Sequence, residues 1–224
     1  MPETPMDSLP EDPTLEEIQL FLAPYIAEEA AFDGWSDEAL TYAAEAHDID
    51  PATARLAYPD GAMDMIDAWI QSVDAQMQAE FTEERLAAMK IREKITELVW
   101  YRICGVIPLK EALRRAVSIM AQPQNAPRSA RISWRSADLM WRMAGDTATD
   151  YNHYTKRTIL MGVYSTTLMC FLDDESDEYE DTRAFLERRI DNVMQFEKAK
   201  AKFLKPREGF DLTRFLGRLR YRAD

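Results

Sequence analysis

The sequence is poor in the residues from which most catalytic and metal sites are built. Its 224 residues include two histidines and two cysteines. Neither His47 nor His153 has a metal-ligand partner at helical spacing, and no HExxH, CxxC or ExxH pattern occurs. The serines do not lie in a nucleophile elbow, and there is no glycine-rich phosphate loop. These absences predict a protein that is not an enzyme and that needs no metal and no cofactor.

Glycine is scarce as well, with seven in the whole chain. Apolar residues recur at helical spacing nearly throughout, and no segment alternates with a period of two. The sequence therefore predicts an all-α protein. Hydrophobic residues make up 46% of the chain, which is enough for a substantial core. Cys104 and Cys170 both fall in apolar helical patterns and are interpreted as reduced core thiols.

Targeting signals are also missing from the start of the sequence. MPETPMDSLPEDPTLEE is acidic and proline-rich, without the basic region of a secretory signal or the arginines of a transit peptide. No apolar run is long enough to cross a bilayer. We therefore expect a cytoplasmic protein, peripheral on the inner face of a bacterial membrane.

Basic residues are almost absent from the first part of the chain. Residues 1–80 contain nineteen acidic residues and a single basic one, Arg55, whereas residues 183–224 contain twelve basic and six acidic residues. The amino-terminal part should repel polyanions, and the carboxy-terminal part should attract them.

The first part of the chain predicts a disordered tail over residues 1–13 and a three-helix head over residues 14–61. Pro24 should kink or break the first helix, and Ser36 should cap the second. The short third helix begins at Pro51, and the arrangement resembles the DNA-binding head of TetR-type repressors. A helix that enters DNA needs cations for the phosphates, and this one offers only Arg55. We therefore expect no nucleic-acid partner, and keep a TetR-type ligand-responsive regulator as the alternative function.

Residues 62–205 predict a helical body. Helices are expected over residues 62–89, 90–106 and 111–120. A further helix should run from Arg128 to Trp141, and another over residues 179–203. Residues 158–172 carry no charge and are apolar on nearly every face, so we expect a central helix that other helices surround. It is too short to span a bilayer.

Residues 206–224 predict a separate amphipathic helix at the carboxy terminus. Its apolar residues fall on one arc of roughly 100°, while Arg214 and Arg218 lie outside it. The residues on the arc are Leu212, Phe215, Leu216 and Leu219, and Phe210 can pack against Phe215 as a hydrophobic staple. Such a helix either docks on its own protein or lies on a membrane, and the basic run from Lys198 to Arg207 favours an anionic membrane surface.

One set of residues resembles a known family. The set comprises Met140-Trp141, Ala144-Gly145-Asp146, Thr149-Asp150-Tyr151-Asn152, Tyr154-Thr155-Lys156-Arg157, Tyr164, Glu180-Asp181-Thr182, Phe185-Leu186 and Arg189. In order and spacing it is similar to the lipid-binding accessory proteins of ubiquinone biosynthesis, and more weakly so from about Thr14 to the end. The resemblance implies a TetR-like scaffold that binds an isoprenoid quinone or another lipid. It also implies a homodimer by analogy, because TetR-like scaffolds commonly pair through their last two long helices.

The resemblance places a lipid pocket among the helices behind the head. The middle of the chain is rich in Met and Trp, which suit a pocket for an irregular hydrocarbon but are equally typical of an ordinary core. The candidate lining residues are Trp69, Trp100, Leu139, Tyr164 and Leu168.

The resemblance also implies a surface that binds the di-iron hydroxylase acting on demethoxyubiquinone. The candidate residues are Met140, Asp150, Asn152, Tyr154 and Arg157, of which Tyr154 and Arg157 are favoured interface types. The alternative is a well-capped helix start with a solvated face. His153 departs from the family pattern, since some relatives have Trp there, and this weakens the expected aromatic anchor.

Overall fold

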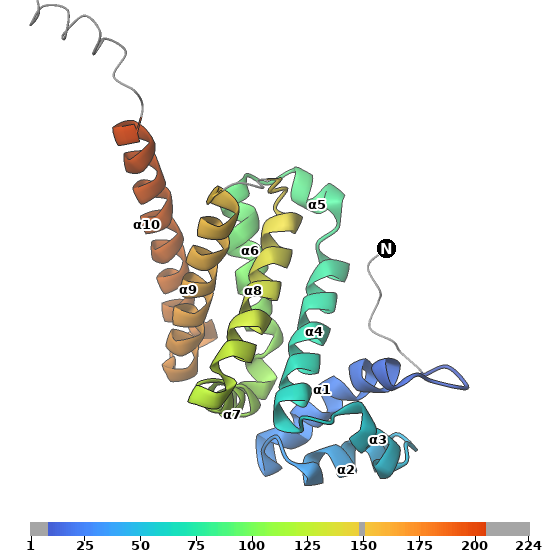
Figure 1. The fold of residues 1–224 in the computed structure, drawn as a ribbon. Coiled ribbons are helices and arrows are strands. Elements are labelled where there is room, and N and C mark those ends of the chain that lie inside the picture. Colours follow the sequence, from blue (N-terminus) through green and yellow to red (C-terminus); the bar gives the residue numbers. More distant parts are fainter. Residues whose placement is uncertain (1–8, 148–150, 205–224) are drawn as a thin grey trace, which may run out of the picture. The chain divides into compact units, whose positions relative to one another are not determined.

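The computed structural model describes residues 9–147 and 151–204, and within those ranges the regular structure is helical (Figure 1). The α-helices are α1 (Leu15–Asp33), α2 (Asp37–Ala46), α3 (Pro51–Ala57), α4 (Ala62–Glu80), α5 (Glu83–Ala87), α6 (Ile91–Gly105), α7 (Lys110–Met120), α8 (Ala126–Met143), α9 (Tyr151–Asp173) and α10 (Glu180–Leu204). Short 3-10 turns η1 (Ile107–Leu109), η2 (Pro123–Asn125) and η3 (Asp177–Tyr179) precede α7, α8 and α10. The predicted all-α class is confirmed. None of the described helices is both long and apolar enough to cross a membrane.

Side-chain caps start the three helices of the head where the sequence places them. Thr14 and Glu17 form a capping box at α1, and Ser36 accepts a hydrogen bond from the Ala39 amide at α2. Asp50 caps α3 in the same way through Thr53. Helix α1 is not broken at Pro24, which lies inside it.

The predicted helix over residues 62–89 is interrupted. Helix α4 ends at Glu80, and Thr82 caps the short α5 by accepting from the Arg85 amide. Phe81 between them is buried, so its apolar character matched the helical pattern although its backbone has left the helix. A threonine cap inside an otherwise periodic segment was the missed signal.

The head packs tightly on the body. The Trp35 indole nitrogen donates to the Ala112 carbonyl on α7 at 2.9 Å, and the Trp35 and Trp69 rings lie 5.3 Å apart. One buried cluster extends from α1 through α4 to α7 and α9. The chain divides into two compact units after Ile190, so the expected head and most of the expected body form one unit. Of the expected tail, Leu9 packs against this core, and residues 1–8 lie outside the described residues.

Helix α9 is not surrounded on every side, contrary to the sequence-based expectation. Leu160, Val163 and Phe171 are buried, and α9 packs on α8 and α6. Met169, on another face, is 52% exposed, and Ser165 is exposed too. The absence of charge over this segment therefore reflects one buried face and one uncharged exposed face.

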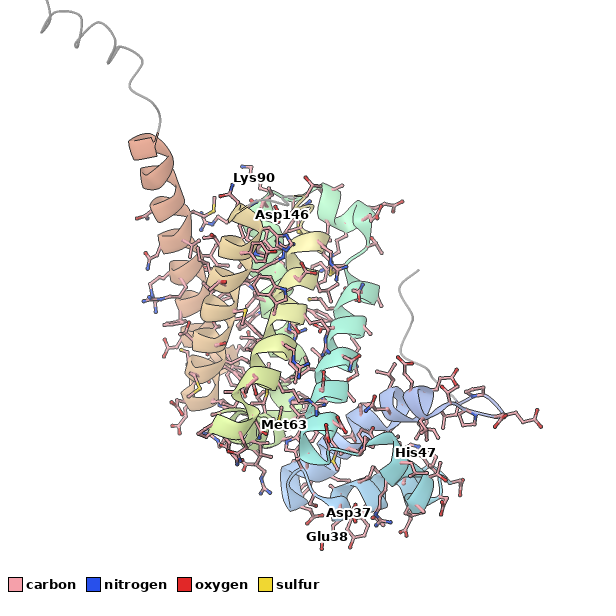
Figure 2. All side chains as sticks on the ribbon, in the orientation of Figure 1. Asp37, Glu38, His47, Met63, Lys90 and Asp146 are labelled. Atoms are coloured by element: carbon pink, nitrogen blue, oxygen red, sulfur yellow. The ribbon has the colours of Figure 1, made fainter. Side chains whose placement is uncertain are left out.

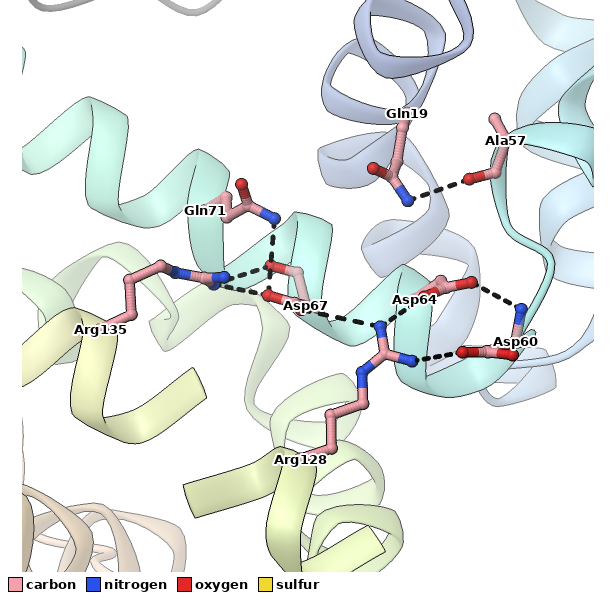
Figure 3. Close-up of polar contacts among 8 residues, drawn as sticks. All are labelled: Gln19, Ala57, Asp60, Asp64, Asp67, Gln71, Arg128 and Arg135. Atoms are coloured by element: carbon pink, nitrogen blue, oxygen red, sulfur yellow. Dashed lines mark hydrogen bonds and ion pairs between the residues drawn. The ribbon is translucent and has the colours of Figure 1, made fainter. Parts of the chain in front are cut away.

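An ion-pair network joins the start of α4 to α8 (Figure 3). Arg128 reaches Asp60 at 3.1 Å and Asp67 at 3.6 Å, and it also pairs with Asp64. Arg135, two turns further along α8, pairs with Asp67 at 2.5 Å. The network fixes the first half of α8 against α4, and both helices contribute walls to the cavity described next.

Candidate functional site

A cavity of about 260 Å³ lies among α4, α6, α7, α8 and α9. Most of its wall is apolar, including Trp69 and Val73 from α4, Leu113 and Val117 from α7, and Leu168 from α9. Three further lining residues, Ala121, Ser165 and Met169, are exposed, so the cavity reaches the protein surface. An apolar cavity with a few polar groups is the usual form of a site for a small molecule.

One part of the cavity wall is polar and deeply buried. Arg102 from α6 is 2% exposed and pairs through Nη1 with Asp74 on α4. The Ser136 hydroxyl from α8 donates to the other Asp74 carboxylate oxygen at 2.9 Å. The guanidinium carbon lies 5.0 Å from the centre of the Tyr164 ring. The Arg102 Nε is buried and has no hydrogen-bond partner among the described residues.

The sequence contains a signal for this buried ion pair. Hydrophobic periodicity alone, however, does not distinguish a buried charge from a charge on a solvated helix face. Arg102 follows Leu98 and Val99 at helical spacing, on the apolar stripe of α6, and Asp74 stands between Val73 and Met77 of α4. A charge on an apolar stripe in each of two neighbouring helices predicts a buried pair, because neither is stable there alone.

The cavity brings together three of the five predicted lipid-binding residues. Trp69, Tyr164 and Leu168 line it, whereas Trp100 and Leu139 do not. The Trp100 ring instead lies under the Arg183 guanidinium at 5.1 Å.

Two residues of the predicted partner surface are in the core, and this expectation needs correction. Met140 is 0% and Arg157 is 2% exposed. Arg157 donates to Asp138 at 2.5 Å, to Asp146 at 3.0 Å and to the His153 carbonyl at 3.1 Å. Its charge is therefore used to hold α9 to α8 and the following turn, and it is not available to a partner. Asp150 lies outside the described residues.

The same junction is reinforced by a second cation. Lys156 pairs with Asp146 at 2.6 Å, and the Trp141 indole donates to the Lys156 carbonyl at 3.0 Å. Asp146 lies at the end of the helices away from the head (Figure 2). The motif that carries the family resemblance thus builds the α8–α9 junction.

Next to this junction lies an aromatic surface, which we define as the exposed Tyr154 and the half-buried Trp134 and His153. Tyr154 is 62% exposed, and its ring lies 5.9 Å from Trp134 and 5.2 Å from His153. Asn152, which precedes His153 in the sequence, is also exposed. Trp134 was not singled out from the sequence, because a tryptophan on a helix reads as core.

The head offers little to a polyanion. Arg55 pairs with Asp37 at 2.9 Å and also donates to Thr41. Asp37 and Glu38 lie together at the start of α2 (Figure 2). The single basic residue of the head is thus engaged by an acidic neighbour.

The fold and the cavity define an all-α protein of TetR-like architecture with an internal site. The fold is similar to a crystal structure described as the TetR transcriptional regulator from Nitrosomonas europaea, with a TM-score of 0.62 over 81% of this chain and 98% of that chain. The two sequences are 19% identical, so the comparison shows the fold alone.

The sequence comparisons match the chain to one family of proteins. Residues 126–197 match the COQ9 family model. The chain is 34% identical to the rat mitochondrial ubiquinone biosynthesis protein COQ9 over 168 residues, 72% of this chain and 54% of that protein. The human protein of the same name is 32% identical over 72% of this chain and 52% of its own length. The chain thus spans about half the length of these curated relatives, and the resemblance predicted from the sequence is confirmed.

The comparisons also correct the expected location. The rat, human and Dictyostelium relatives are all named as mitochondrial, so the expectation of a cytoplasmic protein on a bacterial membrane is wrong. The prediction rested on the composition of the first residues, whereas the chain spans only about half the length of these relatives.

Some of the predicted features lie outside the residues that the structure describes. The expected amphipathic helix over 206–224 is outside the described residues, and with it Phe210, Leu212, Arg214, Phe215, Leu216, Arg218 and Leu219. Among the residues that are described, no group of three or more His, Cys, Asp or Glu could hold a metal ion. The homodimer stays a prediction.

Proposed function

We propose that this protein is a non-enzymatic accessory protein of ubiquinone biosynthesis that binds a quinone intermediate and presents it to the demethoxyubiquinone hydroxylase. The names of the relatives support the role in ubiquinone biosynthesis. The observation that carries the binding role is the apolar cavity, since the segment matched by the family contains α8 and α9, which form two of its walls.

A protein that carries quinones is needed because of their low solubility. A polyprenyl quinone is nearly insoluble in water, so an enzyme outside the bilayer depends on a protein that shields the apolar part during transfer. An interior lined by Trp69, Val117 and Leu168 supplies such shielding without any catalytic group.

The aromatic surface is the proposed contact with the hydroxylase. Tyrosine and tryptophan are among the residue types that dominate binding energy at protein interfaces, and here Tyr154 is exposed and Trp134 is half-buried. Arg157 supports this surface from the core, because it fixes the start of α9, which carries His153 and Tyr154, and Met140 is buried on α8. Trp134 supplies an aromatic group beside His153, with the two ring centres 6.2 Å apart.

Contact with an anionic membrane is proposed from the sequence of residues 206–224. Liposome flotation tests it: binding should need anionic lipid and should weaken when residues 207–224 are deleted. Undiminished flotation after the deletion would contradict it.

The TetR-type regulator is not favoured by any observation beyond the fold. Arg55 is held by Asp37, and the head has no other basic residue with which to bind phosphates. A gel shift at low salt is expected to show no sequence-selective binding to duplex DNA.

Native mass spectrometry of the purified full chain, followed by lipid extraction, tests the central proposal. We expect a co-purified lipid in near-stoichiometric amount. A protein that stays empty when purified from quinone-containing membranes, and that takes up no quinone offered in vesicles, contradicts it.

A further inference from the structure

We propose that the cavity recognises the oxygen-bearing ring of an uncharged lipid through Arg102, and does not merely accept hydrocarbon. The inference rests on the proposed function, in which this cavity holds a lipid. It is carried by a buried, incompletely bonded guanidinium in the wall of a largely apolar cavity.

The first argument concerns the unpaired donor. Arg102 directs Nη1 to Asp74, but its Nε has no partner among the described residues although the side chain is 98% buried. A buried donor without an acceptor is costly, and hydrogen bonds to charged groups are the stronger ones. The guanidinium also belongs to a lining residue of the cavity, so a guest that brings an acceptor oxygen to it adds a hydrogen bond to a group that Asp74 alone does not satisfy.

The second argument concerns charge. Arg102 is the one charged residue among the described residues that line the cavity, and Asp74 already neutralises it. Ser136 in turn occupies the second oxygen of Asp74. A phosphate or carboxylate would therefore enter a site with no net positive charge and would be left buried without a counterion. A ring carbonyl, hydroxyl or ether oxygen loses much less on entry, so the site favours an uncharged acceptor.

The third argument concerns size. An engineered cavity of about 150 Å³ accepts benzene. At about 260 Å³ this cavity has room for a substituted ring and the first part of a tail, but not for a long polyprenyl chain. The ring then lies beside Tyr164, close to Arg102, and the tail leaves past the exposed Ser165 and Met169.

Calorimetric titration of the full-length protein with three matched probes tests the proposal. The probes are a 1,4-benzoquinone with one isoprenyl group, isoprenylbenzene, and isoprenylbenzoate. The wild-type protein should bind the quinone at least about tenfold more tightly than isoprenylbenzene, the scale of one hydrogen bond to a charged group. The benzoate should bind more weakly than the quinone.

Arg102→Lys is the decisive variant, because its amine still pairs with Asp74 while the planar guanidinium is gone. We expect the preference for the quinone to fall below about threefold, with isoprenylbenzene binding unchanged. The matched control is Arg131→Lys on the exposed side of α8, which should behave as wild type. If Arg102→Lys does not fold, the neutral pair Arg102→Gln with Asp74→Asn removes the same donor and should show the same loss.

The outcomes separate the two proposals. Equal binding of the quinone and isoprenylbenzene by the wild-type protein would overturn recognition by Arg102 and leave lipid binding standing. Tightest binding of the benzoate would overturn the preference for an uncharged guest. An unchanged preference in Arg102→Lys would also overturn the role of Arg102, and failure of all three probes to bind would count against the proposed function itself.

Discussion

Two buried arginines, Arg157 at the α8–α9 junction and Arg102 at the cavity, lie in contrasting surroundings. Arg157 has two carboxylates and a backbone carbonyl as acceptors. Arg102 pairs with one carboxylate, its buried Nε has no partner among the described residues, and its side chain lines the cavity. Both residues are 2% exposed, so burial does not distinguish them. They differ in how completely their hydrogen bonds are satisfied. The complete set at Arg157 indicates a structural network, whereas the incomplete set at Arg102 indicates a candidate binding site.

The largest effect is expected at the closed network. Arg157→Met should lower the free energy of unfolding by about 3 kcal/mol, because it leaves the buried Asp146 carboxylate and the half-buried Asp138 carboxylate with fewer partners. Chemical denaturation measures this change. The control is Arg142→Met, which also removes a partner of Asp138 but is 62% exposed and should cost less than about 1 kcal/mol. Equal losses in the two variants would show that the junction is not a closed network.

A third polar group, at the turn between α9 and α10, extends the comparison to pH. Burial raises the pKa of Asp174, but hydrogen bonds from the side chains and backbone amides of Ser176 and Thr182 outweigh it and lower the pKa to about 2. The stabilisation, about 2 kcal/mol, is present above the ordinary pKa of 3.8 and is lost as the pH falls through about 2. Unfolding measured between pH 5 and pH 2 should show this loss, and Asp174→Ala should remove it. An identical pH profile in the variant would contradict the assignment.

Filling the cavity should have a smaller effect on stability, and of opposite sign. Ala116→Leu adds three carbon atoms to the cavity wall and should raise the free energy of unfolding by about 1 kcal/mol. Thermal unfolding of lipid-free protein measures it. A marked loss of stability would mean that the space beside Ala116 is already filled.

The smallest effect on stability is expected at the aromatic surface. Tyr154→Ala should change the free energy of unfolding by less than about 0.5 kcal/mol, since the side chain is largely exposed, yet it should reduce co-purification with the hydroxylase. Tyr42→Ala, at a 55% exposed tyrosine of the head, is the matched control. Unchanged co-purification in Tyr154→Ala would count against this surface.

The sequence predicted local structure better than it predicted which charges are buried. The helix start at Ser36 depends on neighbours within three residues, so it could be predicted directly from the sequence. The break at Phe81 was missed because an apolar residue satisfies the helical pattern whether or not the helix continues.

The errors at the site have a common physical cause. Arg157 was assigned to the surface because its segment is polar, but its acceptors on Asp138 and Asp146 come from another helix and the turn that follows it. Trp100 and Leu139 were assigned to the cavity from composition, which does not say which face of α6 or α8 meets the space. Tertiary contacts across helices decide both questions, and one sequence does not display them.

Lipid occupancy of the cavity-filling variant tests the account most directly. Native mass spectrometry should find co-purified lipid on the wild-type protein and on Ala130→Leu, whose substitution lies on the exposed side of α8, but little on Ala116→Leu. Equal lipid on all three proteins would place the guest elsewhere and contradict the cavity as the binding site.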